Sequence, residues 1–479
     1  MSKPQAVRAI LCADIGTSSL KAALVDYDGH LRAFAREAYP SELVAQGRAD
    51  SADWEKAFTK AVATLNSSAI KSVMEISAVC ISGNGPTFVP VSIKGETFEG
   101  LFWHDGHTAP PAAALRDGSR ARSLFLPRAA WFARERREEY RSCRYLISSQ
   151  EWLSMRLGAD PVTILPSPAY EPIYWDADQL EAWELDAEKF PPFVALGEQI
   201  GNIDKAAAER YGLKSGIPII AGGPDFIMAL IGVGSIENGV ICDRAGTSEG
   251  INVCSNRPAH TLELRTLPHL REGLWNVGAM LPTTGRLFEW FRTITGQTGK
   301  SYVEMLEEIG GASPREFKAG QSGKGGFFFP DLHAVDGLGA SSAFISTAGL
   351  TTRAELGRAV IESIGFMVRG AIEKLERHGY RVDGMRLSGG QAKNLAWNRM
   401  KADMTGRCLA VPVIADGELA GNACTALVAL GEVRDLESAV EKVVRIEQVY
   451  EPDQAAYAMH SERYDAYRAM SAKMEKFLS

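Results

Sequence analysis

The chain has 479 residues, of which 46% are hydrophobic and 23% are charged, and its net charge is −7. At roughly 150 residues per domain, this length predicts two or three domains of globular composition. The acidic balance argues against nucleic acid or an anionic membrane surface as a partner, because neither attracts an acidic protein over a long range.

Targeting and cysteine patterns point to a reducing compartment. The start has no apolar signal core, and no apolar run reaches the roughly 20 residues that span a bilayer, so we expect a cytoplasmic location. The seven cysteines stand at positions 12, 80, 143, 242, 254, 408 and 424, without a Cys-x-x-Cys pair. Their odd number and their apolar surroundings indicate reduced core residues rather than a disulfide framework or a zinc site.

Two strands joined by a polar turn open the chain. The apolar run from Val7 to Ala13 and the segment from Leu20 to Val25 have the composition of buried strands. The sequence Gly-Thr-Ser stands between them, at residues 16–18. The glycine has no Cβ, so backbone N–H groups of this turn can meet the oxygens of a phosphate. Asp14 precedes the turn, and a carboxylate near phosphates usually acts through a divalent cation. The alternative is an ordinary hairpin with a solvated aspartate.

A helix capped by Asp50 or Ser51 is predicted next, and Trp54 in its first turn either lines a pocket or packs in the core. The following buried strand, Ile76 to Ile81, runs into a polar, glycine-rich turn. Such a turn at the carboxyl end of a strand is where α/β proteins place ligand groups. Asn84 and Thr87 are therefore candidate hydrogen-bonding residues, unless this is a plain turn.

Trp103 and Asp105 form a Trp-x-Asp element with flanking histidines. An indole ring can cover the apolar C–H face of a polyol while the carboxylate accepts hydrogen bonds from its hydroxyl groups. The histidines at 104 and 107 have no partner cluster, so a metal site is not predicted there.

Several further helices are expected from apolar positions at helical spacing. They are predicted at 127–139, 148–157, 283–292 and 354–377, and the charged tail at 445–479 is expected to be helical and on the surface.

A second candidate site lies at Asp225, where a buried strand and a glycine turn lead into an apolar helix rich in small residues. Aspartate at a helix N-terminus is often only a cap. The carboxylate can instead sit against a substrate hydroxyl and act as a general base. Both interpretations remain open from this segment alone.

The opening motif recurs over residues 239–254, where an apolar strand, a Gly-Thr-Ser turn at 246–248 and a second apolar strand follow one another. Self-similarity of this kind indicates a duplicated unit. Two such turns would hold the phosphates of one nucleotide from opposite sides.

A strand joins a helix at Gly389 and Gly390, and Asn394 follows. Adjacent glycines let a flat ring lie against the backbone, and the Asn394 amide offers both a donor and an acceptor to a purine edge. The alternative is a plain strand-to-helix turn. A helix around Gly421, rich in small residues, could pack closely beneath such a site.

Taken in order, the four motifs around Asp14, Asp225, Gly246 and Asn394 resemble those of the FGGY carbohydrate kinases, in the superfamily of hexokinase, actin and the large heat-shock chaperones. The resemblance covers nearly the whole chain. It implies an α/β fold of two ribonuclease-H-like domains, of the actin-like ATPase type, flanking a central cleft. The implied parts are a sugar-binding domain at 1–238, an ATP-binding domain at 239–440 and a C-terminal helical tail at 441–479.

The resemblance also implies roles for residues at matching positions. Asp225 corresponds to the general base that deprotonates the sugar hydroxyl, and Asp14 together with Asp225 to the carboxylates that organise Mg²⁺. The implied substrate contacts are Asn84, Thr87, Trp103, Asp105 and Asp225. The implied ATP contacts are Gly16, Thr17, Ser18, Lys21, Gly246, Thr247, Ser248, Gly389, Gly390 and Asn394.

The chain departs from the family pattern at several positions, and these departures bear on which sugar is bound. The residues from Asn84 to Thr87 stand where glycerol kinases have an Arg-Glu pair and xylulokinases a Gln-Met-His stretch. His107 replaces the arginine of Trp-x-Asp-x-Arg, and Pro224 before Asp225 is less usual. The second domain has residues 331–339 in place of a Gly-Glu-Arg-x-Pro segment.

The sequence thus predicts ATP-dependent phosphorylation of a hydroxyl of a small sugar or polyol, with a xylulokinase-like ketose kinase favoured. Catalysis would consist largely of positioning and charge neutralisation at the γ-phosphoryl group, with domain closure excluding water. A P-loop kinase is not expected, because no Walker-type motif is present. Alternatives are a catalytically silent sugar sensor and a chaperone-like ATPase, for which no peptide-binding domain is evident. A homodimer would fit the family.

Overall fold

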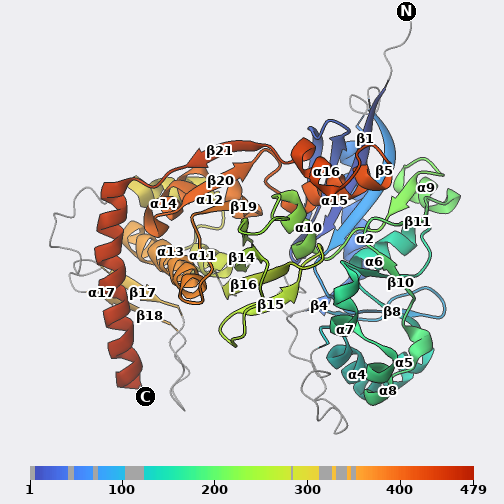
Figure 1. The fold of residues 1–479 in the computed structure, drawn as a ribbon, viewed down its shortest axis with the longest axis horizontal. Coiled ribbons are helices and arrows are strands. Elements are labelled where there is room, and N and C mark those ends of the chain that lie inside the picture. The colour runs from blue at the N-terminus through green and yellow to red at the C-terminus, as the bar shows by residue number, and fades with distance from the viewer. Residues whose placement is uncertain are drawn as a thin grey trace, which may run out of the picture. The chain divides into compact units, whose positions relative to one another are not determined.

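The computed structural model contains two compact units, each built around its own β-sheet (Figure 1). Unit 1 consists of Met1–Ile236, Pro268–Leu274 and Asp416–Arg445, and unit 2 of Glu237–Leu267, Trp275–Ala415 and Ile446–Ser479. The described residues are 6–40, 48–67, 74–102, 123–246, 248–281, 284–311, 326–330, 342–346 and 352–478.

Unit 1 has a six-stranded sheet in the order β11-β12-β5-β1-β2-β3. β2 runs antiparallel to both β1 and β3, β5 is parallel to β1, β12 is parallel to β5, and β11 is antiparallel to β12. The strands are β1 (Val7–Ile15), β2 (Ser19–Asp26), β3 (Leu31–Ala38), β5 (Met74–Gly83), β11 (Gln199–Asn202) and β12 (Pro218–Ile220).

Unit 2 has a seven-stranded sheet in the order β15-β16-β14-β13-β19-β20-β21. β14 runs antiparallel to β13 and β16, β19 is parallel to β13, β20 is parallel to β19, and β21 is antiparallel to β20. The strands are β13 (Ile241–Ala245), β14 (Glu249–Ser255), β15 (Arg265–Pro268), β16 (Trp275–Leu281), β19 (Gly384–Ser388), β20 (Cys408–Pro412) and β21 (Ile446–Tyr450).

The two sheets repeat one plan. In each, three antiparallel strands are bordered on the side of the first strand by two parallel strands and then by an antiparallel edge strand. The edge strand β11 precedes its neighbour β12 in the chain, whereas β21 follows β20, and the second sheet has an additional strand, β15, beyond β16. In both units the sequence Gly-Thr-Ser stands between the first two strands. The shared strand arrangement agrees with the duplicated unit that the recurring motif predicts.

The helices cover these sheets, and shorter strand pairs lie outside them. Unit 1 contains α2 (Ser51–Leu65), α4 (Leu126–Glu135), α5 (Arg137–Ser142), α6 (Ser149–Leu157), α7 (Glu171–Tyr174), α8 (Ala177–Ala182), α9 (Lys205–Tyr211), α10 (Asp225–Gly232), α15 (Gly417–Ala429) and α16 (Leu436–Val443). Unit 2 contains α11 (Thr284–Ile294), α12 (Tyr302–Gly311), α13 (Arg353–Arg377), α14 (Leu395–Thr405) and α17 (Gln454–Leu478). The short pairs are β4 (Arg48–Ala49) with β7 (Gly100–Leu101), β6 (Val89–Ser92) with β8 (Cys143–Ile147), β9 (Thr163–Leu165) with β10 (Phe193–Ala195), and β17 (Gly326–Phe329) with β18 (Ala343–Ser346).

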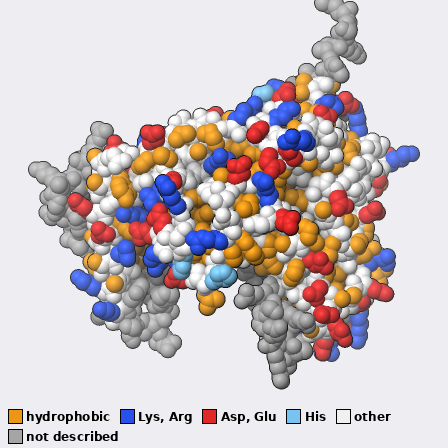
Figure 2. All heavy atoms as spheres, in the orientation of Figure 1, with side chains coloured by type: hydrophobic (Ala, Val, Ile, Leu, Met, Phe, Trp, Pro, Cys, Tyr) orange, Lys and Arg blue, Asp and Glu red, His pale blue; other side chains and the backbone are white. Residues whose placement is uncertain are grey.

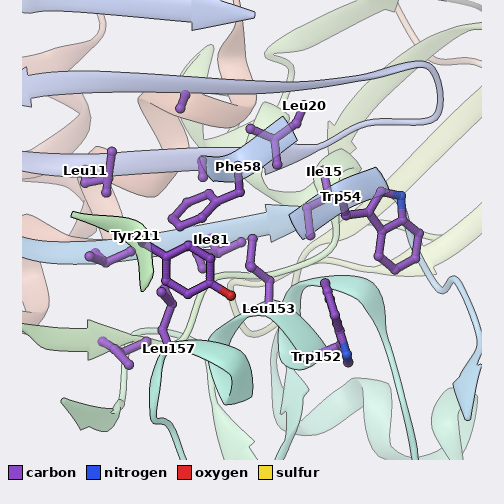
Figure 3. Packing of buried hydrophobic residues seen from close by; sticks show 14 of the residues in the cluster. Leu11, Ile15, Leu20, Trp54, Phe58, Ile81, Trp152, Leu153, Leu157 and Tyr211 are labelled. Atoms are coloured by element: carbon purple, nitrogen blue, oxygen red, sulfur yellow. The ribbon is translucent and has the colours of Figure 1, made fainter. Parts of the chain in front are cut away.

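The core of unit 1 fills the space between the sheet and helices α2, α6 and α9 (Figure 3). Trp54 on α2 is 1% exposed and meets Trp152 on α6 edge to face, with ring centroids 5.8 Å apart. Phe58 packs in the same way against Tyr211, with centroids 5.3 Å apart. Trp54 is therefore a core residue, which decides between the two interpretations left open by the sequence. Asp50 caps α2 as expected, since its side chain accepts from the N–H of Ala52.

Helix α15 belongs to unit 1, although it lies late in the chain. Figure 1 shows it with α16 beside β1 and β5, and it packs against α10 and both of these strands. Close packing requires glycine, because a Cβ at Gly421 would lie 2.0 Å from the carbonyl oxygen of Met228. The predicted ATP-binding domain at 239–440 includes this helix, whereas its contacts place it with the first sheet.

The C-terminal segment differs from the predicted helical tail at 441–479. Ile446–Tyr450 forms strand β21 at the edge of the second sheet, and only then does α17 begin. Four of its five residues are exposed, so this edge strand lacks the apolar pattern of a buried strand. α17 is anchored to α13 by Arg463, whose Nε lies 3.1 Å from Glu362 Oε1, both side chains being buried.

On the face shown in Figure 2, basic side chains lie among acidic ones, in keeping with a modest net negative charge. None of the helices in the described part of the chain combines the length and apolar character needed to cross a bilayer. All seven cysteines are free thiols, and all except the exposed Cys408 are buried.

Candidate active site

The predicted site residues of unit 1 that the structure describes lie at one edge of its sheet. β1, β5 and β12 are parallel, so their carboxyl ends lie at the same edge. Asp14 and Ile15 end β1, Gly83 ends β5, and Asp225 follows β12 after a short turn. Ligands of open α/β sheets bind outside these strand ends, so the observed register brings the candidate residues to a suitable place.

Asp14 is a buried carboxylate, only 1% exposed. Its Oδ1 accepts a 2.9 Å hydrogen bond from Ser82 Oγ on the adjacent strand β5, and its Oδ2 lies 3.5 Å from Lys21 Nζ. Burial raises the pKa of Asp14 to about 7, and the charges of Glu418 and Asp225 act in the same direction, against Lys21. Asp14 therefore lies within electrostatic reach of Asp225, as the predicted site requires.

Lys21 stands directly opposite Asp14 on β2 and is surrounded by carboxylates. Its Nζ lies 3.3 Å from Asp416 Oδ1 and 3.6 Å from Glu418 Oε2, in addition to Asp14. Burial alone would lower the pKa of Lys21, but the charges of Glu418, Asp14 and Asp416 outweigh burial and raise it. The predicted phosphate contact is thus a permanent cation held by three acids.

The start of α15 supplies two of these acids. Asp416 precedes the first residue of the helix and Glu418 lies in its first turn, and both are buried. Asn422, one turn further on, donates from Nδ2 to Ala13 O at 2.8 Å and to Ser82 Oγ at 3.1 Å. These bonds fix α15 against the ends of β1 and β5 and so position its carboxylates.

Asp225 is the first residue of α10 and is half-buried. Its Oδ1 accepts a 2.7 Å hydrogen bond from the N–H of Phe226. The preceding turn is tied to β5, since Gly83 N donates to Gly223 O at 3.3 Å and Gly83 pairs with Pro224 as a parallel bridge. The structure therefore holds Asp225 beside the turn that carries Asn84.

Asn84 and Thr87 are completely buried. Thr87 Oγ1 donates to Asn84 Oδ1 at 2.5 Å, and Asn84 N donates to Ile15 O at 2.8 Å. The other amide atom of Asn84, Nδ2, has no hydrogen-bond partner. Thr87 thus orients Asn84, and Asn84 retains a donor that the protein leaves unused.

The turn at 16–18 is tight, with Gly16 N donating to Ser19 O at 3.0 Å. Gly16 and Thr17 are half-buried and Ser18 is exposed. A Cβ at Gly16 would lie 2.9 Å from Ser19 O, so the close turn depends on glycine at this position.

In unit 2, the second turn follows β13, and Gly246 N donates to Ser248 O at 2.9 Å. Gly389 lies alongside with φ of 98°, and a Cβ there would lie 2.4 Å from Ala245 O. Gln391 Nε2 donates to Gly246 O at 3.1 Å. The predicted phosphate turn and the predicted adenosine segment of this unit are therefore adjacent.

Asn394 caps helix α14, because its Oδ1 accepts from the N–H of Trp397 at 3.0 Å. Asn394 Oδ1 is therefore already used within the protein, whereas the predicted adenosine contact would use this oxygen as the acceptor for a purine N–H. Gly390 has open space on the side where a Cβ would project. Trp103, Asp105 and Thr247 lie outside the described residues.

The acidic cluster suits a hydrated Mg²⁺ ion bound through one or two carboxylates, because no three of these described carboxyl groups have oxygens within 4.8 Å of one another. Asp14, Asp225, Asp416 and Glu418 supply hard carboxylate oxygens, the ligand type that Mg²⁺ prefers, and Lys21 balances only one of their charges. Glu418 Oε2 is buried without a hydrogen-bond partner. It is ion-paired with Lys21 Nζ at 3.6 Å, and because three acids share this one lysine, the cluster keeps a net negative charge that suits a cation.

Asp416, Glu418 and Asn422 are absent from the site residues predicted from the sequence. An acidic residue ahead of a helix is ordinarily a cap or a partner of the helix dipole. A signal was available, since Asp416-Gly-Glu418 precedes an otherwise uncharged helix of small residues. Only the tertiary packing of α15 on β1 shows where these carboxylates lie.

Two domain families match the chain. The N-terminal domain of the FGGY family of carbohydrate kinases matches residues 9–232, and the C-terminal domain of that family matches residues 244–430. The chain belongs to the FGGY family of carbohydrate kinases. This membership confirms the family predicted from the four motifs, and with it the enzyme class of a phosphotransferase acting on carbohydrates.

Among curated proteins, a xylulose kinase of Staphylococcus epidermidis is 23% identical, over 96% of this chain and 96% of its own length. An autoinducer-2 kinase of Enterobacter sp. is 25% identical, over 71% of this chain. The matched part spans 66% of the autoinducer-2 kinase. At these identities the relatives indicate a sugar kinase without specifying the sugar.

Solved structures confirm the fold. A gluconate kinase from Lactobacillus acidophilus has a TM-score of 0.77 at 20% identity, and the xylulose kinase from Rhodospirillum rubrum has 0.75 at 21%. Each match covers 98% of this chain and 100% of the other. The predicted α/β architecture of the FGGY kinases is therefore correct.

Proposed function

We propose that this FGGY kinase transfers the γ-phosphoryl group of ATP to a hydroxyl of a small sugar, with Asp225 as the general base. The observation that carries the proposal is the cluster of Asp14, Lys21 and Glu418 beside Asp225 at the carboxyl ends of β1, β5 and β12. At one edge of the sheet, this cluster combines a base that can accept a hydroxyl proton with carboxylates that can bind a metal ion.

Asp225 is suited to the role of base by its place. The first turn of α10 holds its carboxylate through Phe226 N–H, and the half-buried side chain keeps access to a ligand. A general base must lie within hydrogen-bond reach of the proton that it removes. In this proposal the attacking hydroxyl lies between Asp225 and the γ-phosphoryl group, and its proton passes to the Asp225 carboxylate as the O–P bond forms.

Asp14 and Asp225 would hold Mg²⁺, with Glu418 oriented toward the same cluster through Lys21. When bound, the ion neutralises charge on the phosphoryl oxygens. The chain's own contribution is to keep Asp14 at a fixed orientation through Ser82, and to keep Lys21 charged.

The phosphate chain of ATP would contact the two Gly-Thr-Ser turns. In unit 2, the exposed Gly246 lies beside Gly389, where the lack of a side chain permits a close approach. We assign Gly389 and Gly390 to the adenosine side. Asn394 would take part through its amide nitrogen, because its oxygen caps α14.

A ketose of the xylulose type is the favoured substrate, since a xylulose kinase matches the chain over nearly its full length. Asn84 and Thr87 are proposed to form part of the sugar pocket, together with Trp103 and Asp105. The homodimer and the cytoplasmic location stay predictions.

The proposal is tested by incubating the purified protein with Mg-ATP and a panel of pentuloses, hexuloses, polyols and aldonates, and measuring ADP. At least one sugar should raise ADP formation well above the rate without sugar. A panel in which sugars stabilise the protein thermally but none is turned over would contradict a kinase and indicate a sensor.

A further inference from the structure

Gln150 is a buried amide whose polar atoms are incompletely used by the protein. It is 0% exposed and lies in the first turn of α6. Its Oε1 accepts from Ser149 Oγ at a long 3.5 Å, and its Nε2 has no hydrogen-bond partner. Buried amides in folded proteins nearly always find partners, so an unpaired one requires an explanation.

Gln150 lies at the candidate site. A Cβ at Gly83 would lie 2.8 Å from Gln150 Oε1 and 2.3 Å from Ser149 Oγ, so the start of α6 packs directly on the end of β5. Gly83 in turn pairs with Pro224, the residue before Asp225. The absence of a side chain at Gly83 is what admits the glutamine to this edge of the sheet.

Asn84, the next residue after Gly83, repeats the pattern. Thr87 occupies its Oδ1, and its Nδ2 is buried without a partner. Two amide groups on neighbouring backbone segments thus have unpaired N–H donors at the same strand end. A single ligand with oxygen acceptors would satisfy both.

The fold of α6 does not need Gln150. Its neighbour Glu151 caps the helix by accepting from Ser148 N at 2.7 Å and binds Ile164 N at 2.8 Å. Burial keeps the pKa of Glu151 raised, at about 7. Glu151 therefore stabilises the start of α6, and Gln150 is not needed for that role.

The charges around the two amides are of both signs. Asp14, Asp225 and Glu151 are carboxyl groups, Lys21 is shared by three acids, and the buried Arg128 donates from Nη2 to Pro86 O, two residues after Asn84, at 3.0 Å. An amide N–H donates to hydroxyl, carbonyl and carboxylate oxygens alike. The ligand indicated is therefore a sugar that presents oxygen acceptors to both amides.

We propose that Gln150 and Asn84 donate hydrogen bonds to non-reacting oxygens of the sugar, which makes Gln150 a specificity-determining residue of the sugar site. The inference rests on the proposed function, because it places the sugar beside Asp225. It assigns Gln150 to the binding of substrate and gives it no part in proton transfer.

The test compares wild type, Gln150→Met and Gln150→Glu with xylulose, xylitol and gluconate as probes. Methionine keeps the length and volume of the side chain but has no N–H, and glutamate keeps the shape but replaces donors with a carboxyl group. We expect kcat/KM for the preferred sugar to fall about 10- to 100-fold in both variants, mainly through KM, with KM for ATP unchanged.

The control is Gln199→Met, at an exposed glutamine of β11 in the same unit, which should match wild type. Thermal midpoints without sugar should be nearly kept in Gln150→Met, since the wild-type Nε2 has no partner and Oε1 accepts only a long 3.5 Å hydrogen bond from Ser149 Oγ. If Gln150→Met does not fold, Gln150→Glu tests the inference. Activity within threefold of wild type in both Gln150 variants would overturn the inference alone. A wild-type protein that phosphorylates none of the sugars would overturn the proposed function as well.

Discussion

Each unit contains a lysine that is paired with buried carboxylates. Lys21 is placed among three carboxylates in unit 1, and Lys401 lies between Asp243 and Glu249 in unit 2. In each case the acids outnumber the lysine. A buried charge is tolerated only when it is paired and hydrogen-bonded, so both lysines maintain the local fold next to a Gly-Thr-Ser turn.

Lys401→Met should destabilise the protein by roughly 3–5 kcal/mol at pH 8, because it leaves Asp243 and Glu249 buried without their cation. Lys401 Nζ lies 2.7 Å from Asp243 Oδ2, and all three side chains are at most 1% exposed. Scanning calorimetry at pH 5 and pH 8 measures the change. Lys473→Met, at an exposed lysine of α17, is the matched control.

The pH dependence of this variant has a defined sign. Burial raises the pKa of Asp243 from 3.8 to about 7 in the folded protein. A group whose folded pKa is raised contributes stability that is present below its unfolded pKa and lost as the pH rises through the folded one. Loss of Lys401 raises this pKa further, so the variant should be less destabilised at pH 5 than at pH 8. An equal effect at both pH values would contradict the assignment.

Among the secondary-structure elements, the contact of α10 with α15 matters most for the site. α10 begins at Asp225, and α15 carries Glu418 in its first turn. A Cβ at Gly232 would lie 1.8 Å from Gly417 O, so the backbones of the two helices are in direct contact. The spacing between the base and the carboxylate cluster is therefore set by two glycine-dependent helix surfaces.

Gly232→Ala should force these helices apart and lower stability by about 3 kcal/mol or more, at the upper end for overpacked sites. Because α15 also carries Asp416 and Glu418, activity should fall more than the loss of folded protein explains. Thermal unfolding and sugar-dependent ADP release give the two quantities. Gly299→Ala, where a Cβ meets nothing within 4 Å, should leave both unchanged. Wild-type behaviour of Gly232→Ala would show that α15 does not position the site.

Elements with strong local signals are predictable from the sequence. The hairpin of β1 and β2, the Asp50 cap of α2 and helix α13 follow from apolar runs, capping residues and helical spacing. Strand β21 was not predictable, because it is short and mostly exposed and stands between the helices α16 and α17. The predicted helix at 127–139 is broken at Arg136, between α4 and α5.

The site was predictable in part for the same reason. Asp14 and Asp225 stand in local motifs at strand ends, so their positions follow from short segments. Gln150, Asp416 and Glu418 reach the site only through long-range packing, of α6 on Gly83 and of α15 on β1. A helix start with polar residues is ordinarily interpreted as a cap, and only the unpaired atoms in the folded chain indicate more.

For the molecule as a whole, the two units carry different parts of the proposed reaction. Unit 1 holds Asp225 and the acidic cluster, and unit 2 holds the turn at 246–248 with Gly389 beside it. The repeated sheet plan explains how one ancestral arrangement of strand, turn and strand can serve both. Substitutions in the two units should therefore affect different substrates.

Gln391→Ala tests this division. Gln391 Nε2 binds Gly246 O, and its Oε1 accepts from Trp397 Nε1 at 3.0 Å, so the side chain braces the phosphate turn of unit 2. The KM for ATP should rise about 10-fold, in line with the loss of one or two hydrogen bonds, while the KM for sugar stays the same. Steady-state kinetics with each substrate varied decide this, with the exposed Gln448→Ala as control. A change confined to the KM for sugar would contradict the assignment.

The central claim is that Asp225 removes a proton from a sugar hydroxyl that attacks ATP. Phosphorus NMR of a reaction with Mg-ATP and the best sugar of the panel tests it most directly, in wild type, Asp225→Asn and the exposed control Asp160→Asn. Wild type and control should form a sugar phosphomonoester and ADP in equal amounts. Asp225→Asn should form it about a thousandfold more slowly or not at all, while still being stabilised by the sugar. Phosphomonoester formation at the wild-type rate in Asp225→Asn would contradict the account.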